Sequence, residues 1–116
     1  MRNTTPGAVE VVLYRTRPDI SETQIIDASD ALQMDLEDCP GYLSRRLLRT
    51  QDGLWVDMVE WLSLQQAEAA AAAIMERPSA AHFMALVEES SIQMLHPLPV
   101  KIYGAATALV SPTAAP

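Results

Sequence analysis

The feature that most constrains the fold is a pair of strand-like segments in the middle of the chain, 42–50 and 54–62. They are separated by a Gln-Asp-Gly turn, and an Asp-Gly pair favours a tight β-hairpin, so we expect the two segments to be antiparallel neighbours. Directly afterwards Ser63, with Gln66 at the capping-box position, begins an alanine-rich helical run. Alanine allows a helix to approach a sheet closely, so this region predicts a helix packed on a hairpin.

The flanking segments extend the pattern on both sides. Residues 8–16 are mostly apolar on both faces and predict a central strand, and Ser21 with Gln24 begins a helix that runs to about Glu37. After the alanine-rich helix we expect a short helical segment over 79–86 and a last strand over 89–97. The order β-α-β-β-α-β predicts an α+β, ferredoxin-like fold, a four-stranded antiparallel sheet with helices on one face.

The length of 116 residues suits one domain, which we expect over 1–100. Residues 101–116 are rich in Ala, Thr and Pro and are expected to form a C-terminal tail. The formal net charge of -7 repels phosphate backbones and anionic membrane surfaces, so neither nucleic acid nor a membrane is an expected partner. The single cysteine and the absence of an apolar leader indicate a cytoplasmic location.

Two segments of the hairpin carry a resemblance to a known family. The run Pro-Gly-Tyr-Leu-Ser-Arg at 40–45 and the run Trp-Val-Asp-Met-Val-Glu-Trp at 55–61, in this order of elements, resemble the dimeric α+β barrel superfamily and, more narrowly, the antibiotic biosynthesis monooxygenase group. The resemblance covers about residues 8–98. It implies that two protomers pair their sheets face to face, and that each encloses a small pocket between its own sheet and helices. Some members oxidise polycyclic aromatic compounds with molecular oxygen and no cofactor, and others degrade haem.

The first three predicted strands carry apolar residues on both faces, which agrees with such pairing. In a sheet with one face in water, the side chains along each strand alternate cleanly between apolar and polar. A second copy of the same sheet is the economical cover, since two-fold homodimers are the commonest oligomers. We therefore expect a homodimer.

Trp55, Asp57 and Trp61 share one face of the third strand. In the haem-degrading members of the family a tryptophan of this strand crowds the substrate, and Trp61 is the residue most similar to it. The alternative is that both tryptophans are large core or interface anchors.

His82 is a candidate general base or ligand, because imidazole transfers protons near neutral pH, although a lone histidine is more often structural. The strand-one asparagine of the haem degraders is missing here, which disfavours haem breakdown. Two histidines without a third ligand at suitable spacing do not make a metal site. We expect no metal and no cofactor.

Tyr14, Arg46 and Asp57 form a second candidate group if the first three strands are adjacent. Arg46 either holds an enolate or carboxylate of a ligand, or pairs with Glu10 or Asp57 to fix strand register, because a buried charge must be paired. The candidate catalytic residues are thus His82, Tyr14 and Asp57, and the expected ligand pocket contains Trp55, Trp61, Phe83 and Arg46.

The sequence leaves three functions open. The first is a cofactor-independent monooxygenase that acts on a small apolar or phenolic compound. Such an enzyme need only deprotonate the substrate, hold the resulting anion and exclude water. The second is a non-enzymatic small-ligand-binding or stress-associated homodimer, and the third is a structural homodimer with a filled interior.

Overall fold

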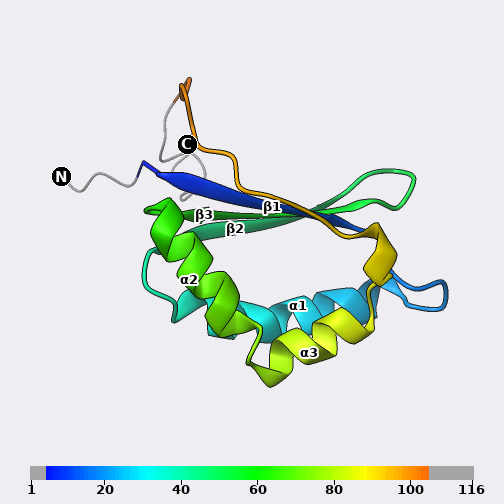
Figure 1. Ribbon diagram of the computed structural model, residues 1–116. Coiled ribbons are helices and arrows are strands. Elements are labelled where there is room, and N and C mark those ends of the chain that lie inside the picture. The colour runs from blue at the N-terminus through cyan, green and yellow to red at the C-terminus, as the bar shows by residue number, and fades with distance from the viewer. Residues whose placement is uncertain (1–4, 105–116) are drawn as a thin grey trace, which may run out of the picture.

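The computed structural model describes residues 5–104, so most of the predicted tail, 105–116, lies outside the described residues. Its elements are β1 (Ala8–Tyr14), α1 (Glu22–Glu37), β2 (Tyr42–Arg49), β3 (Trp55–Trp61), α2 (Leu64–Ile74), α3 (Pro78–Ala85), the 3₁₀ helix η1 (Glu89–Ser91) and β4 (Gln93–Leu95). The strands form one antiparallel sheet in the order β2-β3-β1-β4, and the helices lie on one face of it (Figure 1). This confirms the predicted α+β, ferredoxin-like fold.

The predicted hairpin of β2 and β3 is present. Its turn is closed by Thr50 N–H donating to Leu54 O at 2.8 Å and by Gly53 N–H donating to Thr50 O at 3.1 Å. Gly53 has a φ of +94°, a conformation that glycine adopts without a steric penalty. The Asp-Gly signal therefore located the turn correctly.

A β-bulge interrupts β2 near its start. Tyr42 pairs with Trp61, but the next paired residue of β2 is Ser44, opposite Glu60, so one residue is extra on this strand. Beyond the bulge, Arg45 pairs with Val59, a buried residue on the helix-covered face. The bulge therefore places Arg45, and not Arg46, on the side of the helices.

Both predicted helix starts are present. The Ser21 hydroxyl accepts from Gln24 N–H at 3.2 Å, while the Gln24 side chain accepts from Ser21 N–H at 2.8 Å, a complete capping box. At α2, the Ser63 hydroxyl accepts from Gln66 N–H at 3.1 Å. The hydroxyls satisfy N–H groups that the first turn of a helix leaves without partners.

The last strand is shorter than predicted. Instead of a strand over 89–97, residues 89–91 form η1 and only 93–95 form β4. The Ser91 hydroxyl donates to Glu88 O at 2.6 Å and accepts from Arg15 N–H at 2.8 Å. Such a side chain competes with the ladder for backbone partners and delays the start of the strand.

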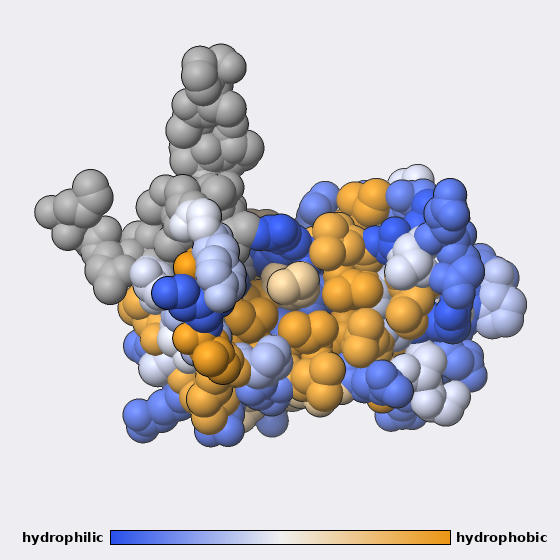
Figure 2. All heavy atoms as spheres, turned by 90° about the horizontal axis from the view of Figure 1, so that it is seen from above, coloured by the Kyte–Doolittle hydropathy of each residue, from blue (hydrophilic) through white to orange (hydrophobic). Residues whose placement is uncertain are grey.

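The face of the sheet that points away from the helices is largely apolar (Figure 2). Val11 of β1 lies opposite Met58 of β3 at its centre, and Leu48 of β2 and Leu95 of β4 are 44% and 53% exposed. We call this surface the outer sheet face. Among residues 5–104 there is no helix with the length and apolarity needed to cross a membrane.

Candidate functional site

A cavity of about 250 Å³ lies between the sheet and the helices. Its apolar wall is formed by Val12, Leu32, Leu36, Val59, Trp61, Ala70, Ala71, Ile74, Met75, Ala80, Phe83, Met84, Val87, Ile92 and Met94. Four more lining residues carry ionisable or hydroxyl groups, namely Glu10, Tyr14, Arg45 and Asp57. The sheet supplies all four. We call the sheet side of the cavity its floor; it carries all the polar groups of the lining, and the helices contribute only apolar residues.

The floor contains a buried ion pair between Arg45 of β2 and Asp57 of β3. Arg45 Nε donates to Asp57 Oδ1 at 2.9 Å and Nη2 donates to Oδ2 at 2.7 Å, and the two side chains are 5% and 9% exposed. The remaining nitrogen, Nη1, donates to Ser29 O at 3.1 Å and to Gln33 Oε1 at 3.3 Å. Both charges are thus satisfied inside the protein. Burial pulls the pKa of Arg45 down, but the hydrogen bonds and charge of Asp57 outweigh it and leave the pKa raised.

Glu10 of β1 is the second carboxylate of the floor, and its surroundings differ. It lies opposite Val59, and its side chain is 12% exposed. Within the described part of the chain its nearest basic side chain is His96, whose Nε2 lies 3.5 Å from Glu10 Oε2. Burial, with a smaller contribution from the charge of Asp57, raises the pKa of Glu10, although His96 and Arg45 oppose the shift.

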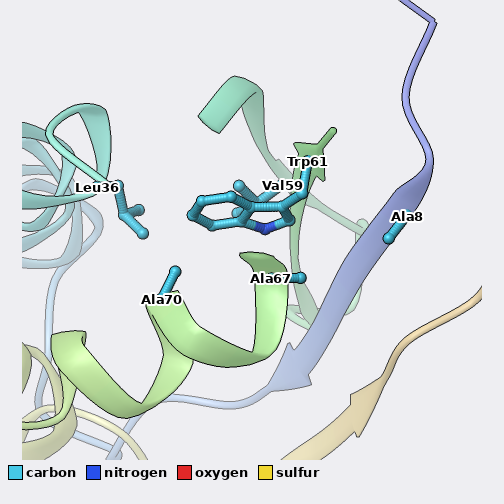
Figure 3. Close-up of a cluster of buried hydrophobic side chains, with 6 residues drawn as sticks. All are labelled: Ala8, Leu36, Val59, Trp61, Ala67 and Ala70. Atoms are coloured by element: carbon cyan, nitrogen blue, oxygen red, sulfur yellow. The ribbon is translucent and has the colours of Figure 1, made fainter. Parts of the chain in front are cut away.

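Trp61 ends β3 beneath helix α2 and is 1% exposed. Its indole lies between Leu36 of α1 and the small side chains Ala67 and Ala70 of α2 (Figure 3). Tyr42 contacts the ring edge-on at 5.9 Å between centroids. The indole Nε1–H is buried and has no hydrogen-bond partner among residues 5–104, and buried indole N–H groups normally have one.

Tyr14 ends β1 at the other side of the cavity and is 2% exposed. Its ring stacks on Trp55 at 6.3 Å and meets the edge of Phe83 at 5.5 Å. Its hydroxyl is likewise buried without a hydrogen-bond partner in the described residues, as is His96 Nε2. Burial, reinforced by the charge of Asp57, raises the pKa of Tyr14 far above its ordinary value. Tyr14 is therefore a hydrogen-bond donor at physiological pH and not a base.

The sequence matches no protein-family model and no curated protein at a significant level. Solved structures are similar, however. SnoaB, a cofactor-independent oxygenase from Streptomyces nogalater, has a TM-score of 0.71 and 14% identity, over 86% of this chain and 99% of SnoaB. The monooxygenase from the gene ActVA-Orf6 of Streptomyces coelicolor, solved with nanaomycin D, has a TM-score of 0.68 and 19% identity, over 89% and 96% of the two chains. The chain has an antibiotic biosynthesis monooxygenase-like fold.

A third structure with this ABM-like fold is a MhuD variant with two manganese protoporphyrin IX molecules per active site, at a TM-score of 0.66 and 17% identity, over 84% and 99% of the two chains. Identities of this size establish the shared fold and leave the chemistry to be argued from the residues present.

Within the ABM-like fold, the cavity brings together four of the predicted site residues, Tyr14, Asp57, Trp61 and Phe83. Trp55 is buried behind Tyr14, outside the lining.

The other two predicted residues lie elsewhere. His82 is exposed on α3 and does not line the cavity, and Arg46 is exposed on the outer sheet face, where it pairs with Met58. The cavity arginine is Arg45, which was not predicted because a bulge has no reliable sequence signal here. From the sequence alone, Glu10 was considered only as an ion-pair partner. Glu10 lies on the same face of β1 as Tyr14, and this alternation is the sequence signal that could have placed it in the cavity.

Proposed function

We propose that this protein is a cofactor-independent monooxygenase that acts on a small, largely apolar phenolic or anthrone-like compound. The observation that carries the proposal is a pair of unpartnered buried donors, Trp61 Nε1–H and the Tyr14 hydroxyl, at an apolar cavity. Trp61 pairs with Ala8 and Tyr14 with Trp55, at opposite ends of the β1–β3 ladder, so ligand oxygens that gain negative charge during reaction would satisfy the two donors separately. The fold of SnoaB, an oxygenase described as cofactor-independent, supports the assignment.

The reaction needs no electrons from the protein. For an anthrone-like compound, a CH₂ group and one O₂ give a C=O group and one water, so the substrate supplies both the electrons and the hydrogens that reduce the second oxygen atom. What remains for the protein is to bind the substrate, favour its ionised form and exclude water. The cavity of about 250 Å³ is slightly below the roughly 300 Å³ at which pockets for drug-sized ligands begin, so it suits a compact, planar molecule.

The buried residues divide these tasks. Phe83 and Leu32 belong to the apolar wall that packs against the rings of the substrate. Trp61 and Tyr14 offer N–H and O–H groups to its oxygen atoms from the two ends of the cavity. Asp57 keeps the Arg45 charge neutralised, so that the guanidinium does not attract anions into the cavity.

We also propose that two copies pair through their outer sheet faces, as the apolar character of that face supports (Figure 2). In this arrangement each cavity stays within one protomer, on the opposite side of the sheet from the interface.

The test is oxygen uptake by the purified protein with anthrone and with 1-naphthol. Wild type should consume oxygen above the rate in buffer, and Trp61→Phe and Tyr14→Phe should each lower the rate about 10²–10³-fold, as expected for the loss of a donor to a developing oxyanion. Tyr103→Phe removes a hydroxyl from a tyrosine that is 83% exposed and should leave the rate unchanged. Thermal stabilisation by these compounds without oxygen uptake would reject the enzyme and favour a ligand-binding protein.

A further inference from the structure

The two carboxylates of the cavity floor differ in their hydrogen-bond and ion-pair partners. Both oxygens of Asp57 accept short hydrogen bonds from Arg45, and the guanidinium directs its remaining nitrogen away to α1. Glu10 has no such arginine, and its closest basic group among the described residues, the His96 imidazole, lies 3.5 Å away. Glu10 is therefore the carboxylate that is less engaged by a cation, and the more available of the two to take a proton from a molecule in the cavity.

The sheet register connects Glu10 to the surface. β1 and β4 pair Val11 with Leu95, so the next residue pair in the same register is Glu10 with His96. Glu10 lines the cavity, while the His96 side chain is 28% exposed at the edge of the sheet. Cavity, carboxylate, imidazole and solvent thus follow one another along a single row across the sheet.

We propose that Glu10 is the general base of this cavity and that His96 carries its proton to solvent. This inference deepens the proposed function and rests on it, since it assigns the residue that ionises the substrate. In the step, a C–H bond of an anthrone-like ligand breaks and the proton goes to a Glu10 oxygen. The electron pair stays on the ligand as an enolate, whose oxygen accepts from the unpartnered donor at its end of the cavity, Trp61 or Tyr14. The proton then leaves through His96, which restores the carboxylate.

The same charges define the class of substrate. A neutral carbon acid or phenol enters beside one free carboxylate, and the proton transfer moves the negative charge without adding a second one. A ligand with its own carboxylate would place two like charges in a buried site whose arginine is already bonded, which is strongly unfavourable. The cavity should therefore select neutral acids and reject carboxylates.

The titration of Glu10 fits this role. The titratable and charged groups that face it are His96 just beyond β4, Asp57 of β3 and Arg45 of β2, and the net result with burial is a raised pKa of Glu10. The cavity-lining residues of all three helices are apolar and add no charge. A carboxylate with a raised pKa is a stronger base, and its pKa is closer to the pH at which the protein operates.

The decisive experiment follows proton abstraction without oxygenation. Under anaerobic conditions in D₂O, exchange of the anthrone CH₂ hydrogens is measured by NMR with wild type, Glu10→Gln, His96→Gln and Glu68→Gln. We expect wild type to exchange above the buffer rate and Glu10→Gln to be about 100-fold slower or more, as for loss of a general base. Glu68→Gln, the same change at an exposed position of α2, should match wild type.

His96→Gln should slow exchange less than Glu10→Gln does, and it should alter the pH profile. Thermal stabilisation by anthrone reports whether each variant still folds and binds. If Glu10→Gln binds anthrone and exchanges as fast as wild type, or if wild type binds it without exchange, the assignment of Glu10 is overturned. Exchange by wild type without aerobic oxygen uptake would retain Glu10 as base and reject the monooxygenase.

A binding comparison tests the substrate class separately. Wild type should bind 1-naphthol more tightly than 1-naphthoate, and Glu10→Gln should reduce this preference because it removes the like charge. An unchanged preference in Glu10→Gln would contradict the electrostatic argument.

Discussion

At the scale of single residues, Arg45 determines how the two carboxylates of the cavity behave. It binds both oxygens of Asp57 and is anchored to α1 through Ser29 and Gln33. A buried pair of this kind contributes little net stability compared with apolar residues, but leaving one partner alone is costly. The main effect of Arg45 is to pair with Asp57 and leave Glu10 as the cavity carboxylate without an arginine partner among the described residues.

Arg45→Met should therefore lower the free energy of unfolding by about 3–5 kcal/mol, because Asp57 is left buried without its partner. The double variant Arg45→Met, Asp57→Leu removes both charges and should recover most of the loss. Urea unfolding of the two variants and of Asp57→Leu completes the cycle. Equal losses in the single and double variants would show that the ion pair is not the cause.

Glu10 gives the protein a pH-dependent stability of defined sign. Its folded-state pKa is raised above the ordinary value of 4.5, so the folded protein holds the proton at pH values where the unfolded chain has lost it. Wild type should lose stability relative to Glu10→Gln as pH rises from about 4.5 through the raised pKa, and the difference should be constant above it. Urea unfolding from pH 4 to 8 measures this difference. A gap that instead widens as pH falls would contradict the prediction.

At the scale of elements, the sequence predicted what local chemistry encodes. The capping residues Ser21 and Ser63 and the Asp-Gly turn specified both long helices and the hairpin, because each acts on backbone groups a few residues away. The shared face of Trp55, Asp57 and Trp61 followed from strict alternation in β3.

The β2 bulge could not be predicted in this way. Strict alternation from Tyr42 assigns Arg46 to the face of the tyrosine, but the extra residue reverses the assignment and brings Arg45 there. The exposed position of His82 could not be predicted either, because a short helix that follows a proline can pack with either face towards the core. Both depend on tertiary contacts that local patterns do not report.

The connection from α1 to β2 depends on Gly41. Its φ is +89°, and a Cβ there would lie 2.5 Å from Gln66 Oε1 and 2.8 Å from Gln66 Cβ. Gly53 has a similar φ, but a Cβ there would meet nothing closer than 3.7 Å. Gly53→Ala should thus cost about 1–2 kcal/mol for the backbone alone, and Gly41→Ala about 1–3 kcal/mol more for the clash. Urea unfolding compares them, and equal costs would contradict the packing argument.

At the scale of the whole molecule, the sheet separates two surfaces of different character. One face forms the floor of the cavity, and the outer sheet face is apolar and uncovered in a single chain (Figures 1 and 2). Isolated soluble chains seldom leave large contiguous apolar surfaces open, so an occupant is expected, and a second copy is the simplest.

Met58→Glu places a charge at the centre of that face and should convert a dimer into a monomer. Met34→Glu makes the same change on α1, where Met34 is 72% exposed, and should leave the dimer intact. Light scattering after gel filtration at micromolar concentration measures both masses. Wild type eluting as a monomer would reject the pairing.

The alanines of α2 have a consequence for how such a protein can diversify. Ala70 and Ala71 contribute small side chains to the wall of the cavity, while every ionisable group that lines it comes from the strands. Adding or deleting methyl groups along one helix would resize the chamber and leave its ionisable residues in place. The size of the chamber and its ionisable groups are thereby encoded in different segments, and evolution or a protein engineer can alter the first while preserving the second.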